Sequence, residues 1–314
     1  MTTHQAATGE HAAVSLTPSS GKVVASRRVL ITIALLTVYI IWSTTYLAIR
    51  FALESFPPYL MMGIRFVVAG GILFAFLLVR GSKLPTRREW WGAGVIGFLM
   101  LVMGMGNTAN AETMISSGLA ASLIAAMPLI TLLLSLAWGN RPTRSEWIGV
   151  GIGLAGVILL TLEGNLQANP LGLVLIFIAI TCWSLGSLLV KRVPMPSGVM
   201  GNAAEMLIGG LLLCGWAALR GESVAPVVTP GALLALVYLI TFGSLATMTA
   251  YMYLLKNVSP ALATSYSLVN PGLALILGVI LGGEVITGSA LIALPLIILG
   301  IAFVFGLFER RRKA

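Results

Sequence analysis

The sequence predicts an all-α membrane protein with ten transmembrane helices arranged as two inverted five-helix repeats. Of its 314 residues, 58% are hydrophobic and only 9% are charged, and the mean hydropathy is +0.99. The apolar runs are about 20 residues long, which is the helix length that crosses a hydrocarbon core of ~30 Å. A helix satisfies its own backbone hydrogen bonds in lipid, so the bilayer is the expected solvent and lipid the expected surrounding.

The apolar runs define the expected spans in chain order. They are bounded by polar residues, Pro or Gly. The expected spans are 30–49, 58–79, 90–111, 117–138, 147–162, 171–190, 199–219, 231–254, 261–281 and 291–308.

The chain repeats itself after roughly 140 residues. Trp42-Ser43 recurs as Trp183-Ser184, and the block from Gly118 to Pro128 recurs from Ala261 to Pro271. A repeat with an odd number of spans inserts in the opposite sense, and inverted repeats build a substrate site near the bilayer midplane. The expected organisation is a flexible tail at 1–29, repeats at 30–162 and 171–308, and a basic tail at 309–314. This architecture is typical of transporters.

The basic residues predict the orientation, because cytoplasmic loops carry the excess of Lys and Arg. With the amino terminus inside, sixteen of the nineteen basic residues fall in cytoplasmic segments. Arg50 and Arg220 lie outside, and Arg65 lies within a span. Both termini are therefore expected in the cytoplasm. The net charge of +9 is explained by this topology and by anionic lipid, so no nucleic-acid partner is predicted.

The first 29 residues lack the apolar core and cleavage site of a secretory signal. We therefore expect the first span to act as an uncleaved signal anchor. Cleavage after that span is the alternative, and it would destroy the five-plus-five symmetry.

Enzyme chemistry finds little support in the sequence. Both histidines, His4 and His11, lie in the polar tail, and the chain has no aspartate. Cys182 and Cys214 are isolated within predicted helices without metal-ligand spacing. No glycine-rich nucleotide loop follows a strand. The sequence predicts no enzyme, no metal and no cofactor.

Two ionisable residues stand out within the predicted spans, Arg65 and Glu205. A charge at a helix centre costs ~2.5–3.5 kcal/mol on insertion scales, so each should face a wet cavity or a partner. They occupy near-equivalent repeat positions, which predicts either a direct pair or a shared cavity. One interpretation is that Glu205 binds a cationic group or a coupling proton while Arg65 tunes it or holds an anion. The other is a static ion pair between two helices.

Polar and aromatic residues at matching repeat positions predict the lining of a pocket for a small organic molecule. They are Ser43, Ser184, Trp42, Trp183, Tyr266 and Asn270. For Asn107, Asn110, Tyr251 and Tyr253, a role as interfacial anchor or helix contact competes with the pocket. Glycines 149, 153 and 156, with Gly70 and Gly71, predict close helix packing.

Five sequence blocks, taken in order, carry a resemblance to a known family. They are YIIWSTTYLAIR, GIRFVVAGG, SSGLAASLIAAMPL, CWSLGSLLVKR and NVSPALATSYSLVNPGLALILGVILGGE. Their ordered set resembles the two EamA domains of the drug/metabolite transporter superfamily, in particular its bacterial inner-membrane ten-helix subgroup. The resemblance covers residues from about 30 to 308. It implies a central cavity between the halves and export of small organic solutes such as amino acids, metabolites or drugs.

The resemblance is incomplete at two acidic positions. Glu284 matches the family's acid after the ninth span, whereas the first repeat has Arg141 in that place. The small multidrug relatives couple protons through a glutamate in the first span, and this chain has none there. Proton coupling through Glu205 is therefore our own inference, and facilitated uniport stays open.

The sequence thus predicts an inner-membrane transporter for a small-molecule substrate, working by alternating access and most simply as an exporter. An uptake carrier is the alternative within transport. A non-transporting accessory or sensor protein is the alternative outside it. The substrate and the oligomeric state are not determined by these patterns.

Overall fold

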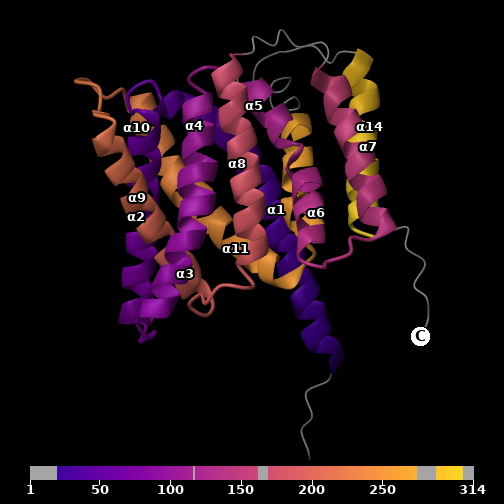
Figure 1. Ribbon diagram of the computed structural model, residues 1–314, viewed down its shortest axis with the longest axis horizontal. Coiled ribbons are helices and arrows are strands. Elements are labelled where there is room, and N and C mark those ends of the chain that lie inside the picture. Colours follow the sequence, from indigo (N-terminus) through magenta and orange to yellow (C-terminus); the bar gives the residue numbers. More distant parts are fainter. Residues whose placement is uncertain (1–19, 116, 162–168, 274–287, 307–314) are drawn as a thin grey trace, which may run out of the picture.

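A computed structural model describes residues 20–115, 117–161, 169–273 and 288–306. Every regular element in these ranges is a helix, which confirms the predicted all-helical class (Figure 1). The elements of the first half are α1 (Ser20–Ala52), α2 (Pro58–Val79), α3 (Arg87–Gly97), η1 (Phe98–Gly106), α4 (Asn107–Ala111), α5 (Ser117–Ile124), α6 (Met127–Ala137) and α7 (Arg144–Thr161). Those of the second half are α8 (Pro170–Leu189), α9 (Val199–Leu219), α10 (Pro230–Tyr238), η2 (Leu239–Ala246), α11 (Thr247–Asn257), α12 (Pro260–Thr264) and α14 (Gly288–Val304).

Seven helical stretches in the described ranges are long and apolar enough to cross a membrane. A shorter apolar helix, Ile292–Val304, accompanies them. The seven are Arg27–Ala52, Pro58–Val79, Arg87–Ala111, Leu119–Ala137, Pro170–Leu189, Val199–Leu219 and Pro230–Asn257. The expected ninth span, 261–281, continues beyond the described residues, and the count of ten stays a prediction.

Proline and capping residues determine where many of the helices begin. Pro58, Pro170 and Pro230 each stand in the first turn, where a missing amide hydrogen costs nothing and the fixed φ suits the helix. Thr86 and Glu89 form a reciprocal capping box at the start of α3. These local signals explain why the observed starts lie close to the predicted ones.

The two halves repeat their helices with a constant offset. Helix α2 begins at residue 58 and α9 at residue 199, a difference of 141. The two π-helical segments, η1 and η2, begin at residues 98 and 239, again a difference of 141. The internal repeat of the sequence is therefore also a repeat of local backbone structure, including its irregular part.

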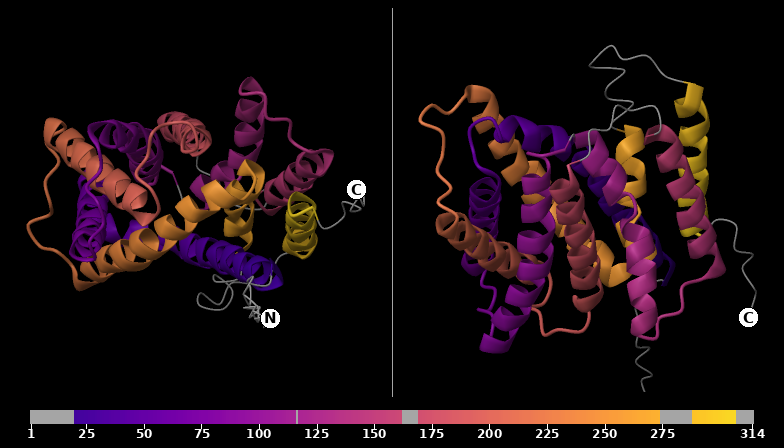
Figure 2. Two further views of the ribbon diagram at one scale, coloured as in Figure 1. Left: turned by 90° about the horizontal axis from the view of Figure 1, so that it is seen from below. Right: turned by 45° about the horizontal axis from the view of Figure 1, so that its top comes forward.

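Two closely packed helix pairs occupy opposite ends of the bundle. Helices α2 and α9 form one, and α7 and α14 form the other. Figure 1 shows the first pair at the left and the second at the right, and both views of Figure 2 keep them apart. Helices α1, α8 and α11 lie between them. The centre of the molecule is thus built from helices of both repeats.

The α7–α14 pair confirms the predicted glycine packing. A Cβ placed on Gly149 would lie 2.6 Å from the Gly300 carbonyl oxygen, and one on Gly156 would lie 2.9 Å from that of Ala293. Gly153 borders both Gly300 and Leu268. Small residues let the two backbones approach this closely.

The α2–α9 pair fixes an antiparallel register. Gly63 lies against Cys214, Gly210 against Phe66 and Val67, and Gly70 against Leu207. Gly70 is therefore a packing glycine as predicted. Gly71 is not, because a Cβ there would meet nothing within 4 Å. The three contacts give one constant register, in which the two residue numbers add to about 277.

The first turns of α1 and the end of α14 lie on the same, lower side of Figure 1. Basic residues gather around the ends of α8 and α11. Arg27 donates to the Asn257 carbonyl, Lys191 to the Val258 carbonyl, and Arg88 and Arg192 border one surface cavity. Such a cluster is what the charge distribution predicts for a cytoplasmic face, although the orientation itself stays a prediction.

Candidate functional site

Four aromatic side chains from four helical segments meet at the centre of the bundle. The ring centroid of Trp42, on α1, lies 5.5 Å from that of Trp183, 5.0 Å from that of Tyr251 and 4.5 Å from that of Tyr266. None of the four is more than 4% exposed. The interplanar angles of 75° to Trp183 and 67° to Tyr266 are edge-to-face geometries that the aromatic quadrupole favours.

Hydrogen bonds hold these rings in place. The Trp42 indole donates to the Gly243 carbonyl oxygen at 3.3 Å, and the Trp183 indole donates to the Tyr251 hydroxyl at 3.0 Å. The Ser187 hydroxyl lies 2.9 Å from the same Tyr251 hydroxyl. Tyr251 is thus fully buried in the cluster, and the interfacial-anchor interpretation of this residue is wrong.

Each tryptophan contacts the π-helical segment of the other repeat. Trp42, in the first repeat, bonds to Gly243 of η2. Trp183, in the second, packs on Gly104 of η1, where a Cβ would come within 2.9 Å of the indole ring. A π-helical segment inside an α-helix is rare and is often found at functional sites. The centre of the molecule therefore has two matching contacts between the repeats.

A small cavity of about 40 Å³ lies against this cluster. Its lining includes Trp42, Tyr46, Thr108, Trp183 and Tyr266, so it draws on both repeats. This volume has room for only a few waters. An organic solute would therefore require the aromatic side chains or their helices to move apart.

The predicted polar residues Ser43, Ser184 and Asn270 do not line this cavity, but they bond to helices that do. The Ser43 hydroxyl donates to Asn270 Oδ1 at 2.9 Å, and Asn270 Nδ2 lies 3.5 Å from the Tyr46 hydroxyl. Ser184 accepts from Thr131 at 2.9 Å. These bonds join α1 to the helix of residues 266–273, and α8 to α6.

Arg65 is fully buried and is held by η2. Its Nε donates to the Ser244 hydroxyl at 2.7 Å, and its guanidinium lies 4.9 Å from the Phe66 ring centroid. Its Nη2 has no hydrogen-bond partner. The same π-helical segment therefore receives both Trp42 and Arg65.

Glu205 is also fully buried, and neither carboxylate oxygen has a hydrogen-bond partner. Tyr251 and Lys256 on α11 lie within range of its electrostatic field. An unpaired buried carboxylate is costly in its charged form.

The predicted direct pair between Arg65 and Glu205 is wrong. In the described part of the chain the ion pair within 4.0 Å is Arg220–Glu222. In the α2–α9 register, Glu205 faces residue 72, seven residues from Arg65. At 1.5 Å per residue this is about 10 Å along the helix axis. The two charges lie on opposite sides of the helix crossing.

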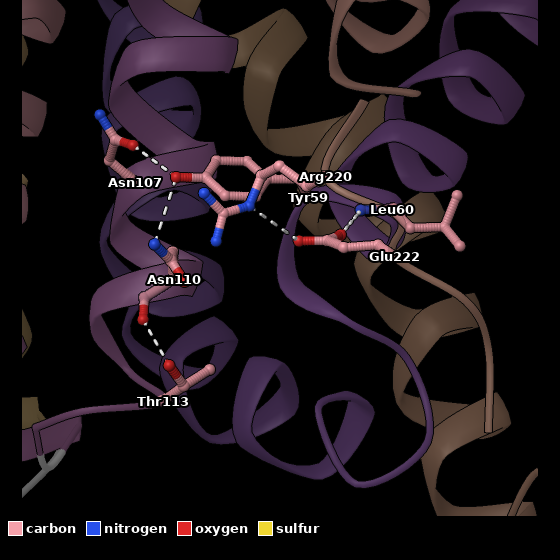
Figure 3. A network of polar contacts seen from close by, with 7 residues as sticks. All are labelled: Tyr59, Leu60, Asn107, Asn110, Thr113, Arg220 and Glu222. Atoms are coloured by element: carbon pink, nitrogen blue, oxygen red, sulfur yellow. Dashed lines mark hydrogen bonds and ion pairs between the residues drawn. The ribbon is translucent and has the colours of Figure 1, made fainter. Parts of the chain in front are cut away.

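A second polar network joins α2, α4 and the end of α9 (Figure 3). The Tyr59 hydroxyl donates to Asn107 Oδ1 at 2.8 Å and accepts from Asn110 Nδ2 at 3.2 Å. Glu222 accepts from the Leu60 amide at 2.8 Å, and Arg220 lies over the Tyr59 ring. Asn107 and Asn110 are therefore buried helix-linking residues, and the competing helix-contact interpretation is the correct one.

Glu112 was not among the residues singled out from the sequence. It follows α4 directly, and both of its carboxylate oxygens are buried without a hydrogen-bond partner. Burial raises the pKa of its carboxyl well above the ordinary value, and Arg50 partly opposes that rise. Its electrostatic field reaches Tyr46, which lines the central cavity. An acid after an Asn-rich end of a span is the sequence signal that could have identified it.

The bundle, its internal repeat and its central cavity define a membrane transporter with two homologous halves. The EamA-like transporter family matches the chain twice, over residues 29–162 and 170–306. The chain belongs to this family.

Individual proteins are similar to this chain over most of its length. The uncharacterized inner membrane transporter YedA of Escherichia coli strain K12 is 44% identical over 272 residues, covering 86% of this chain and 89% of the relative. Protein PagO of Salmonella typhimurium is 28% identical, covering 87% and 92%. A solved crystal structure of another protein is similar with a TM-score of 0.73 at 25% identity, covering 89% of this chain and 99% of that one.

Proposed function

We propose that the protein is an inner-membrane transporter that exports small organic solutes by alternating access of its two halves. In this proposal ten helices cross the membrane and both termini face the cytoplasm. The family match to each half supports two units of similar topology. The basic residues around the ends of α8 and α11 support the orientation.

The central cavity is the observation that carries this proposal. It lies where the two repeats meet, and Trp42 and Trp183 line it from equivalent repeat positions. Inverted repeats that rock about a shared site expose it first to one side of the membrane and then to the other. The aromatic lining suits an organic solute with an apolar or aromatic part.

Glu205 is the proposed coupling residue. Its carboxylate is buried, lacks a hydrogen-bond partner and acts on Tyr251, which belongs to the aromatic cluster. Taking up and releasing a proton there would change the charge that acts on the aromatic cluster. Arg65 has a different proposed role, which is to hold η2 in place through Ser244. Facilitated uniport would not need Glu205 to take up or release a proton.

A resistance and metabolite screen on cells overproducing the protein tests the function. Wild type should change the cellular content of at least one organic solute, and purified protein should carry that solute across proteoliposome membranes. Glu205→Gln should abolish uphill transport driven by a proton gradient while keeping exchange of solute for solute. Glu54→Gln is the matched control, because Glu54 is exposed and does not line the cavity.

Two results would contradict the proposed functions of the protein and of its buried charges. If Glu205→Gln and Arg65→Gln both fold, reach the membrane and transport like wild type, the proposed roles of these residues are wrong. If the purified protein carries no solute found in the screen and always copurifies with a partner, it is an accessory protein.

A further inference from the structure

A groove separate from the central cavity lies between α1, α9 and α11. Its volume is about 420 Å³. Leu30, Ile33, Ala34 and Thr37 form one stripe of α1 along it, at the i, i+3, i+4 and i+7 spacing of a single helix face. Leu30 and Ile33 are 50% and 55% exposed, so the groove borders the surroundings of the bundle.

Cations surround one end of this groove. Lys256 lines it directly and is exposed. Arg27, also exposed, donates one N–H to the carbonyl of Asn257, the residue after Lys256, at 3.4 Å. A guanidinium has five donors, so most of those of Arg27 remain for another acceptor. Lys191 donates to the Val258 carbonyl oxygen at the same helix end, at 3.5 Å.

These cations have no acidic partner in the described residues. The ion pair found there within 4.0 Å, Arg220–Glu222, involves none of them. Capping the α11 terminus explains part of their placement, because cations are favourable at a helix carboxyl end. It does not explain the exposed Lys256 side chain, which lies along the groove. In the described part of the chain, the buried Glu205 feels the charge of Lys256, but no carboxylate forms an ion pair with it.

We propose that the groove binds one anionic phospholipid from the bilayer. The phosphate would lie between Lys256 and Arg27, and one acyl chain would lie along Ile33, Thr37 and Ala250. The groove combines a long apolar wall with a cationic end, which matches an amphipathic anion. A zwitterionic lipid carries a cation of its own that would be repelled there, and a free phosphate would leave the apolar wall uncovered.

Native mass spectrometry of the full chain in detergent micelles tests this site. The probes are phosphatidylglycerol and phosphatidylcholine with identical acyl chains. Near a membrane surface each basic residue contributes an attraction equivalent to about a fivefold change in affinity. We therefore expect wild type to prefer phosphatidylglycerol by about five- to thirtyfold. Lys256→Gln and Arg27→Gln should each reduce that preference about fivefold.

Two further variants separate charge from shape. Lys83→Gln removes an exposed cation at the end of α2, and it should leave the preference unchanged. Ala250→Phe fills the groove without altering charge, and it should reduce binding of both lipids. Because Lys256 and Arg27 are exposed, their variants should fold even if Ala250→Phe does not.

Three outcomes would overturn the proposal. Equal retention of the two lipids by wild type would exclude an anion site. An unchanged preference in both Lys256→Gln and Arg27→Gln would place the site elsewhere. Displacement of phosphatidylglycerol by inorganic phosphate would show that the groove contributes nothing to binding. None of these results bears on solute transport, so the site and the proposed function can fail separately.

Discussion

Trp42 and Trp183 meet edge to face across the junction of the two repeats, with ring centroids 5.5 Å apart and an interplanar angle of 75°. Each contacts the π-helical segment of the opposite repeat, at Gly243 and Gly104. The two residues are equivalent in the repeat, so their contact lies close to the internal symmetry axis. Any movement of one half against the other must change it.

Replacing either tryptophan should slow transport. Trp42→Phe removes the donor to Gly243, and Trp183→Phe removes the donor to Tyr251. A net hydrogen bond is worth about 0.5–1.5 kcal/mol, which corresponds to a roughly two- to tenfold loss of flux. The loss is measured as the flux, into proteoliposomes, of the solute found in the screen. Trp91→Phe is the control because Trp91 is 67% exposed, and tryptophan variants that match it would remove the cluster from the mechanism.

Removing the Ser244 hydroxyl should destabilise the bundle. Arg65 Nε donates to this hydroxyl, and Ser244→Ala would leave the buried guanidinium with fewer acceptors. A hydrogen bond to a charged group contributes about 1.5–3 kcal/mol. The midpoint of thermal unfolding in detergent should fall. Thr241→Val on the exposed side of η2 should have little effect, and equal midpoints for the two variants would contradict the role of Arg65.

The sequence predicted the helical class, the repeat and three of the four aromatic residues of the central cluster, Trp42, Trp183 and Tyr266, because these depend on composition and local pattern. It did not predict the separation of Arg65 and Glu205. Repeat equivalence indicates that α2 and α9 meet, but the register is set by the contacts of Gly63, Gly70 and Gly210 with the opposite helix. Arg65 and Glu205 both precede the point where α2 and α9 cross, and because the two helices are antiparallel, they lie on opposite sides of it. The position of that crossing is a property of the tertiary structure.

A bulkier residue at Gly149 should separate α7 from α14. Gly149→Val would push side-chain atoms into the Gly300 backbone, and overpacking of this kind costs about 1–3 kcal/mol. Gly151→Val, two residues away, is the matched control because a Cβ there meets nothing within 4 Å. The midpoint of thermal unfolding should be lower for Gly149→Val than for Gly151→Val. Similar midpoints would mean that the two helices do not depend on this contact.

Glu112 should make stability depend on pH. Its pKa is raised above the ordinary value of 4.5 by burial, so the folded state holds the proton more tightly than the unfolded state. Stability is then greatest below the unfolded pKa and decreases as the pH rises toward the folded pKa. Glu112→Gln should therefore stabilise the protein more at about pH 8 than at about pH 5. A pH-independent difference between wild type and Glu112→Gln would contradict this.

Tyr251 and Glu112 show a second limit of sequence patterns. Both stand late in a span, where an aromatic or an acid commonly lies at the membrane surface. In this fold Tyr251 instead reaches Trp183 and Ser187. The π-helical segment η2 precedes it, and its wider turns change which face the following residues of α11 present. Period counting along an ideal α-helix does not capture that shift.

Cysteine accessibility of the central cavity tests alternating access most directly. Ile180 lines the cavity, so Ile180→Cys would be made in a chain whose Cys182 and Cys214 are replaced by serine. A membrane-impermeant thiol reagent would be applied outside intact cells and, separately, to inverted vesicles. The account predicts labelling from both sides, with each rate lowered by the transported solute. Labelling from one side alone, or from neither, would contradict a cavity that opens alternately to the two faces of the membrane.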